Sequence, residues 1–252
     1  MTYTVDAVLK AMELLFVVAE EGGKGVTELA KRSGNTKARA FRLLSTLEEC
    51  GLVRRTMPGA SYSLGYRALI IGAAAQNQLN LIQIANEVLA AVGTECNESV
   101  LVRIREGNET VCIAWWDAPH AVRVHNQLGT RRPLGVGASG KLLLAYAPVE
   151  LQTDVLAQDM KKFTDHTIVK RSDLKKELKK ITEDGLSASE AERTAEMVAV
   201  AAPVRDASGT VVASLSMSAP ASRVSKSLLK KHAEVIRRGA ERFSIALGYV
   251  AP

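Results

Sequence analysis

The segment from Val26 to Gly65 constrains the fold of this chain more than any other part of the sequence. It begins with a short helical stretch, VTELAKRSG, whose final glycine marks a turn. A second helical stretch follows, with apolar residues on one face and cationic residues on the other. Two short β-prone runs around Pro58-Gly59 then predict a hairpin. This order of elements predicts a winged helix-turn-helix, which presents one helix to the major groove of DNA.

The second helix of this unit divides into a core face and a cationic face. At 3.6 residues per turn, the predicted core face consists of Ala40, Phe41, Leu43, Leu44 and Leu47. The other face, the turn and the wing supply the candidate DNA contacts, which are Asn35, Thr36, Lys37, Arg39, Arg42, Ser45, Thr46, Arg54 and Arg55. Asn35 or Thr36 can also cap this helix, and Thr27 can cap the preceding one.

The charge of this segment supports DNA binding over an ordinary solvated helix. Residues 31–55 contain seven Lys/Arg and two acidic residues, which gives a net charge of +5. The two acids, Glu48 and Glu49, come at the end of the helix, away from the expected contacts. A second basic run, residues 175–180, is not part of a helix-turn-helix pattern, and we interpret it as the solvated face of a helix.

Composition limits the other functions open to the chain. Its 252 residues are enough for two domains, and 47% hydrophobic residues can give each a core. Only 4% are aromatic, which argues against a stacking surface for single-stranded nucleic acid. Neither a signal peptide nor a membrane span is expected, so we predict a cytoplasmic protein without a membrane partner. Cys50, Cys96 and Cys112 fit neither a disulfide framework nor a zinc site, and buried reduced thiols are expected.

The remaining chain predicts a second, mixed domain. Helical periodicity from Arg67 to Gly93 places a connecting helix at residues 67–79 and the domain junction near residues 76–80. Strands are then expected at 99–105, 110–116, 122–128, 198–205 and 211–218. Helices are expected at 137–147, within 151–184, and at 222–247. Because the strands form hairpins and do not alternate with helices, the predicted sheet is mainly antiparallel.

Both halves of the chain resemble the IclR type of bacterial transcriptional regulator. The matching segments, in order, are TELAKRSG (27–34), FRLLSTLEECGLV (41–53), YSLG (62–65), RPLGVGASGKLLLA (132–145) and AVAAPVRDASGTVVASLSMSAPASRVS (199–225). The resemblance implies an α/β (α+β) protein with an N-terminal winged helix-turn-helix in residues 1–66 and a GAF-like effector and oligomerisation domain in residues 80–252. It also implies operator DNA as a partner and assembly into homodimers or tetramers.

The resemblance further implies a small organic acid as effector, with an aromatic carboxylate as one candidate. Carried over by matching segments, the effector contacts are Ala138, Ser139, Ser189, Ala199, Ser216 and Ser218, with Ser189 in a loop. Ser216 and Ser218 are two apart on a strand, so their hydroxyls share a face. Together with backbone N–H groups at a helix start, they could bind a carboxylate without a buried cation.

This sequence departs from the pattern of the family at three positions. Ser189 and Ala199 replace larger polar residues or cysteine of some relatives, which suggests a roomier and less polar cup. Glu196 stands where glycine is usual before the strand that contains Ala199.

Two other interpretations remain open. The GVGASGK stretch from Gly135 to Lys141 matches a phosphate-loop pattern, but Leu142 replaces the Mg²⁺-binding hydroxyl residue, so neither nucleotide nor another cofactor is expected. His120, His125, His166 and His232 lack metal-ligand spacing, and no catalytic pair is evident.

An enzyme using GVGASGK would show turnover. An architectural DNA-binding protein, whose second domain only oligomerises, would bind no metabolite. We predict an effector-controlled regulator, with a repressor preferred over an activator.

Overall fold

The computed structural model describes residues 4–57, 59–78, 81–125 and 127–251, and it divides into two compact units. The units are Met1–Leu79 and Asn80–Pro252. The junction predicted near residues 76–80 includes positions 79 and 80, which lie outside the described residues.

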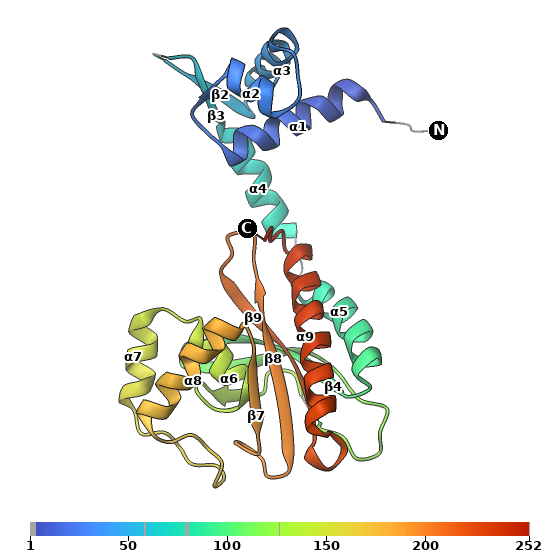
Figure 1. The fold of residues 1–252 in the computed structure, drawn as a ribbon, viewed down its shortest axis with the longest axis vertical. Helices are drawn as coiled ribbons and strands as arrows, with labels where there is room; N and C mark the ends of the chain where they lie inside the picture. Colours follow the sequence, from blue (N-terminus) through green and yellow to red (C-terminus); the bar gives the residue numbers. More distant parts are fainter. Residues whose placement is uncertain (1–3, 58, 79–80, 126, 252) are drawn as a thin grey trace. The chain divides into compact units, whose positions relative to one another are not determined.

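The first unit is a winged helix-turn-helix (Figure 1). Its helices are α1 (Asp6–Glu20), α2 (Val26–Arg32), α3 (Lys37–Glu49) and α4 (Tyr66–Gln78). Its strands are β1 (Lys24–Gly25), β2 (Val53–Thr56) and β3 (Ser61–Leu64), which pair antiparallel in the order β1-β3-β2. The predicted helices and wing hairpin are confirmed, while β1 was not predicted.

Capping explains where the two central helices begin. The Thr36 hydroxyl accepts the backbone N–H of Arg39 at 3.2 Å, so the predicted cap of α3 is confirmed. Thr27 does not cap α2, because pairing of β1 with β3 keeps the chain extended to Gly25 and the helix starts at Val26. The cap predicted at Thr27 is therefore wrong.

The core of this unit is centred on one face of α3. Ala40, Leu44 and Leu47 are buried there against Leu14 and other residues of α1 and α2. Phe41 was predicted on the same face, but it is 47% exposed. At 100° per residue it falls at the edge of the Ala40–Leu44–Leu47 stripe, beyond the contact with the other helices.

The second unit is an antiparallel sheet between two groups of helices. The strands are β4 (Ser99–Glu106), β5 (Glu109–Trp116), β6 (Arg131–Pro133), β7 (Ser187–Glu190), β8 (Met197–Arg205) and β9 (Val211–Pro220), in the order β6-β5-β4-β9-β8-β7. The helices are α5 (Leu81–Cys96), α6 (Gly137–Ala145), α7 (Val149–Ala157), α8 (Arg171–Asp184) and α9 (Lys226–Ala246). The predicted α/β fold class, with a mainly antiparallel sheet flanked by helices, is confirmed.

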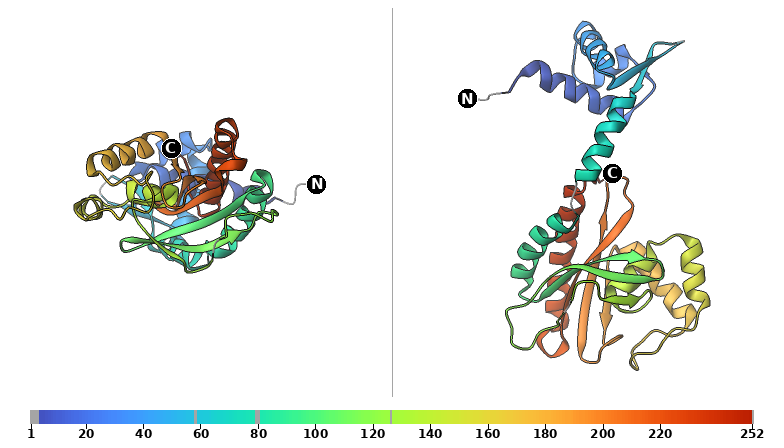
Figure 2. Two further views of the ribbon diagram at one scale, coloured as in Figure 1. Left: turned by 90° about the horizontal axis from the view of Figure 1, so that it is seen from below. Right: turned by 180° about the vertical axis from the view of Figure 1, so that it is seen from behind.

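The two faces of this sheet differ in chemistry. Helices α5 and α9 cover one face, and α6 to α8 lie on the other (Figure 2). The α5–α9 face is apolar, with Val102, Leu215 and Met217 in its core. A Cβ on Gly93 would meet the Trp116 ring at 2.3 Å, so α5 approaches the sheet closely only because that residue is glycine. The α6 face carries small and polar side chains instead, including Ser216 and Ala201.

Several local predictions for the second unit are wrong. No strand forms at 122–128 in the part of the chain that the structure describes, where Val122 and Leu128 are 71% and 55% exposed and have no core to cover. The short edge strand β6 pairs with β5 instead. Ser189 lies on strand β7 and not in a loop. Cys50 is exposed, contrary to the expectation of a buried thiol.

Candidate functional site

The first candidate site is the outer face of α3. Lys37, Arg39, Arg42, Ser45 and Thr46 are all exposed, so the predicted cationic and hydroxyl face is open to a ligand. Thr46 donates its hydroxyl proton to the Arg42 carbonyl at 3.1 Å. Helical spacing of three and four residues gathers these side chains into one ridge, the arrangement with which a recognition helix contacts phosphates and base edges.

Local bonds occupy three of the predicted DNA contacts. Arg39 forms an exposed ion pair with Asp6 of α1 at 3.2 Å. The Asn35 side-chain nitrogen donates to the hydroxyl of Ser33 at 3.0 Å, and Thr36 caps α3. Asn35 and Thr36 therefore fix the shape of the turn, whereas Arg39 has a competing carboxylate that a phosphate would have to displace.

Arg54 and Arg55 lie on opposite faces of the wing because they are consecutive on β2. Arg54 donates to the Ser63 hydroxyl at 3.0 Å across the strand pair. Arg55 lies opposite Tyr62 in the register. Both arginines are exposed, but they cannot point at the same phosphate.

The second candidate site is a cavity on the α6 face of the large sheet. It encloses about 50 Å³, which is smaller than typical pockets of roughly 300–1,000 Å³ and does not meet the expectation of a roomy cup. The structure brings every predicted effector residue into its lining, namely Ala138, Ser139, Ser189, Ala199, Ser216 and Ser218.

Hydroxyl groups form one side of this cavity. The Ser139 hydroxyl at the start of α6 donates to the Ser216 hydroxyl of β9 at 3.0 Å. Ser218 follows on the same face of β9 and pairs in register with Ala199 of β8. The cavity therefore has hydrogen-bonding groups on β9 and α6 beside small side chains that leave space.

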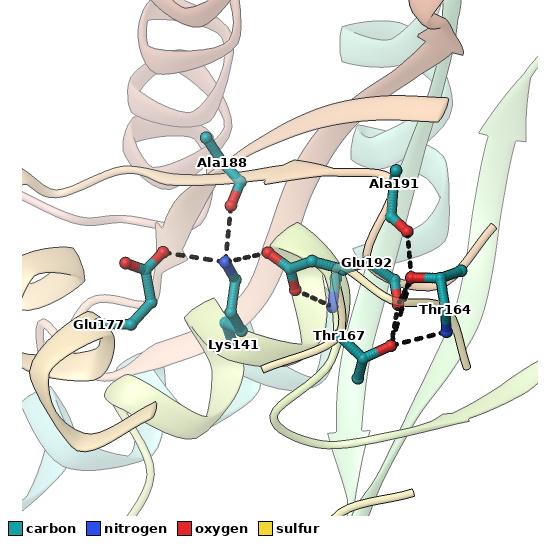
Figure 3. Close-up of polar contacts among 8 residues, drawn as sticks. Lys141, Thr164, Thr167, Glu177, Ala188, Ala191 and Glu192 are labelled. Atoms are coloured by element: carbon teal, nitrogen blue, oxygen red, sulfur yellow. Dashed lines mark hydrogen bonds and ion pairs between the residues drawn. The ribbon is translucent and has the colours of Figure 1, made fainter. Parts of the chain in front are cut away.

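A carboxylate of the chain itself already occupies part of the helix start. The backbone N–H of Gly137 donates to Glu192 Oε2 at 3.1 Å, and the helix dipole favours this negative charge. Lys141 Nζ binds Glu192 Oε1 at 2.5 Å, Glu177 Oε1 at 2.9 Å and the Ala188 carbonyl at 2.8 Å (Figure 3). The lysine of the GVGASGK stretch is thus a buried ion-pair partner with its hydrogen-bonding positions filled.

The segment after β7 is held beside the cavity by threonine hydroxyls. Thr167 donates to the Glu192 carbonyl, and Thr164 to the Ala191 carbonyl, each at 2.6 Å (Figure 3). Ala191 and Glu196 both adopt left-handed backbone, with φ of 54° and 60°. The loop thus requires at Glu196 the conformation that glycine adopts most easily.

Arginines form the other side of the cavity, and they were not predicted. Arg103 of β4, Arg132 of β6 and Arg193 after β7 line it. Arg103 is only 1% exposed, and its Nη1 donates to the Thr130 carbonyl at 3.0 Å. Its Nε and Nη2 are buried without a partner among the described residues, as are Nε of Arg132 and Arg193. The prediction that the receptor lacks a buried cation is therefore wrong.

Burial and neighbouring guanidinium groups lower the pKa of Arg103 and of Arg132. Burial lowers the pKa of Arg103, and Arg193 lowers it further. Burial, Arg103 and Arg193 together lower the pKa of Arg132 to about 10. Burial also raises the pKa of the neighbouring Cys112 thiol, so that thiol is neutral at physiological pH. At neutral pH the arginines remain charged and form a cationic side of the cavity.

Two negative observations apply to the described part of the chain. It contains no group of three or more His, Cys, Asp or Glu residues placed to hold a metal ion. None of its helices is long and apolar enough to cross a membrane.

Family models match both units. The model described as "IclR helix-turn-helix domain" matches residues 7–56, and "Bacterial transcriptional regulator IclR C-terminal" matches residues 73–245. Among similar proteins, the transcriptional repressor AllR of Klebsiella pneumoniae is 30% identical over 96% of this chain and 90% of its own length. The regulator KdgR of Dickeya chrysanthemi is 29% identical over 98% of this chain and 81% of its own length.

Solved structures agree with these matches. The repressor BlcR of Agrobacterium tumefaciens has a TM-score of 0.83 at 25% identity, covering 99% of this chain and 100% of its own. An IclR homologue of Microbacterium hydrocarbonoxydans, complexed with 4-hydroxybenzoate, has a TM-score of 0.62 at 21% identity, covering 96% and 98%. The matching families are transcriptional regulators and not enzymes. The chain is a DNA-binding regulator that belongs to the IclR family of bacterial transcriptional regulators.

Proposed function

We propose that the chain is a cytoplasmic repressor whose affinity for an operator is controlled by a small organic acid bound in the cavity of its second unit. The exposed cationic ridge on α3, within a helix-turn-helix of this family, is the observation that carries the DNA-binding part. Arg39 and Arg42 supply the central contacts, Lys37, Ser45 and Thr46 flank them, and Arg54 and Arg55 reach adjacent DNA from the wing. Asn35 and Thr36 lie at the start of α3, where a helix N-terminus favours phosphate.

The cavity supports the effector part of the proposal. Ala138, Ser139, Ser189, Ala199, Ser216 and Ser218 line it and would contact the acid. The Microbacterium homologue was solved with 4-hydroxybenzoate, an aromatic carboxylate, which supports an organic acid as the ligand class. AllR and BlcR are both named repressors, which favours repression over activation.

Exposed apolar side chains support a dimer or tetramer of this chain. On α4, Leu69, Ile70 and Ile71 are 66%, 51% and 59% exposed. On α1, Val8 and Phe16 are 56% and 62% exposed. Burial of such surface stabilises association by about 25 cal/mol per Å², and two copies of the DNA-reading helix suit a pseudo-palindromic operator.

The DNA-binding proposal is tested with duplexes selected in vitro from random sequence, measured by fluorescence anisotropy at several salt concentrations. Arg39→Ala with Arg42→Ala should weaken binding strongly and reduce the slope of log affinity against log salt by about 1.8 per subunit, since each lost phosphate contact contributes about 0.9. Lys175→Ala with Lys176→Ala removes the same charge from exposed positions of α8 and should leave both quantities nearly unchanged. Equal losses in the two double variants would contradict the assignment of α3.

A further inference from the structure

On the cationic side of the cavity, no carboxylate of the described residues is paired with an arginine. No carboxylate contributes to the shifts in the pKa of Arg103 and Arg132, which burial and neighbouring arginines lower. Glu192, which also lines the cavity, shares the Lys141 ammonium group with Glu177 and is bonded to the start of α6. Buried charges in proteins are normally paired, so the buried Arg103 beside the half-buried Arg132 and Arg193, with no carboxylate of the described chain paired to any of them, favours binding of an anion.

The unused hydrogen-bonding atoms point to the same conclusion. Arg103 is almost fully buried and keeps two nitrogens, Nε and Nη2, without acceptors in the described chain. Its remaining nitrogen, Nη1, is held by Thr110 and Thr130, which fixes the position of the guanidinium plane. The side chain of Arg132 makes no hydrogen bond with any described residue. A guanidinium group offers its donors as a planar fork, which matches the oxygens of a carboxylate or phosphate.

Sheet topology separates this cationic side from the hydroxyl side. Arg132 is on β6 and Arg103 on β4, whereas Ser216 and Ser218 are on β9 and Ser189 is on β7. In the order β6-β5-β4-β9-β8-β7 the two sets occupy different halves of one face. Neighbouring strands are about 4.8 Å apart, so a molecule of four or five heavy atoms in length can contact both halves.

We infer that the effector is a small organic dianion, with one anionic group bound by Arg103, Arg132 and Arg193 and the other end held by the hydroxyls of Ser139, Ser216 and Ser218. This inference extends the proposed function, and it rests on that proposal in treating the bound anion as the effector. A monocarboxylate would bring only one negative charge into a cavity lined by three guanidinium groups. The cavity of about 50 Å³ selects a short molecule.

The test measures binding of matched probes to the full-length protein by thermal shift and calorimetry. Succinate carries two carboxylates, butyrate one, and succinamide none on a chain of similar length, while inorganic phosphate represents a compact dianion. Succinate or phosphate should raise the melting temperature, and succinate should bind at least tenfold more tightly than butyrate. If phosphate binds and succinate does not, the ligand is still a dianion, and its source is a phosphorylated acid.

Variants locate the binding group. Arg132→Met should weaken binding of the preferred dianion by roughly tenfold to hundredfold, as expected for loss of charge-assisted hydrogen bonds. It should also remove the preference over butyrate, while the ligand-free protein melts at the same or a higher temperature, because a half-buried charge that Arg103 and Arg193 repel is gone. Arg131→Met is the matched control, since Arg131 is the exposed neighbour on β6 and pairs with Glu106 and Glu109 outside the cavity. It should change affinity less than twofold.

Three results would overturn the inference: equal affinity for succinate and butyrate, a retained preference in Arg132→Met, or no stabilisation by any dianion at millimolar concentration. Operator affinity measured in the same samples separates this inference from the proposed function. If only a monocarboxylate changes operator affinity, the inference of a dianion is wrong and effector control of operator binding stands. If a dianion binds through Arg132 but leaves operator affinity unchanged, effector control is wrong and the anion site remains.

Discussion

Replacing Lys141 by methionine should destabilise the second unit far more than an ordinary loss of a lysine. The side chain is 2% exposed, and its ammonium group binds Glu192 at 2.5 Å and Glu177 at 2.9 Å. Without it the Glu192 carboxylate, 7% exposed, stays buried without its cation. Breaking a buried ion pair from one side costs about 3–5 kcal/mol.

For a unit of this size each kcal/mol lowers the melting temperature by about 2–4 °C, so Lys141→Met should lower it by roughly 6–20 °C. Thermal unfolding followed by circular dichroism measures this shift. The matched control is Lys179→Met, which breaks a pair with Glu183 whose side chains are 79% and 62% exposed. Such a surface pair contributes about 0.2–1 kcal/mol, so the control should melt within about 4 °C of the unaltered protein.

A double variant tests whether the cost comes from the unpaired carboxylate. Adding Glu192→Gln to Lys141→Met removes the stranded charge and keeps an oxygen that can accept the N–H of Gly137. We expect the double variant to recover about 1–3 kcal/mol relative to Lys141→Met. If Lys141→Met melts like Lys179→Met, or if the second change makes it less stable, the argument from buried charge is wrong.

Three further variants test other parts of the account. Asp6→Asn frees Arg39 from an exposed ion pair and should tighten operator binding about twofold to fivefold. Glu13→Gln makes an equal change of charge elsewhere on α1 and should not tighten it. Equal effects would refute the competition between Asp6 and a DNA phosphate for Arg39. Glu196→Gly relieves a left-handed residue and should raise the melting temperature by about 2–4 °C; a fall in differential scanning calorimetry would count against strain there. Ser216→Ala with Ser218→Ala should weaken succinate binding about tenfold, and unchanged affinity in calorimetry would remove those hydroxyls from the site.

Local sequence signals were sufficient for the elements that depend on local physics. The cap at Thr36, the hairpins at 99–116 and 197–220, and the cationic ridge of α3 follow from side-chain spacing and turn residues, and the structure contains them. Phe41 and the segment 122–128 were misjudged because apolar residues alone do not say whether another element covers them. In each case the covering partner is absent from the described structure.

The cavity was predicted only in part because its charges depend on distant contacts. Arg103 follows an alternating pattern in SVLVRIRE that usually marks a solvent-exposed position, yet packing on the α6 face buries it. In the sequence, Lys141 matches the lysine of a phosphate loop. Only the fold places its ion-pair partners, Glu177 and Glu192, beside it. The one available signal was Lys141 inside GKLLLA, because a helix that is apolar all round is buried.

In the proposed function, a ligand in the cavity and an operator on α3 change each other's binding. The most direct measurement is a complete binding cycle on the full-length protein: operator affinity with and without the acid that stabilises it, and acid affinity with and without the operator. We expect the acid to weaken operator binding and the operator to weaken acid binding by the same factor, within the range of about 5-fold to 150-fold usual for such coupling. A protein whose operator affinity is the same at zero and at saturating acid would contradict it.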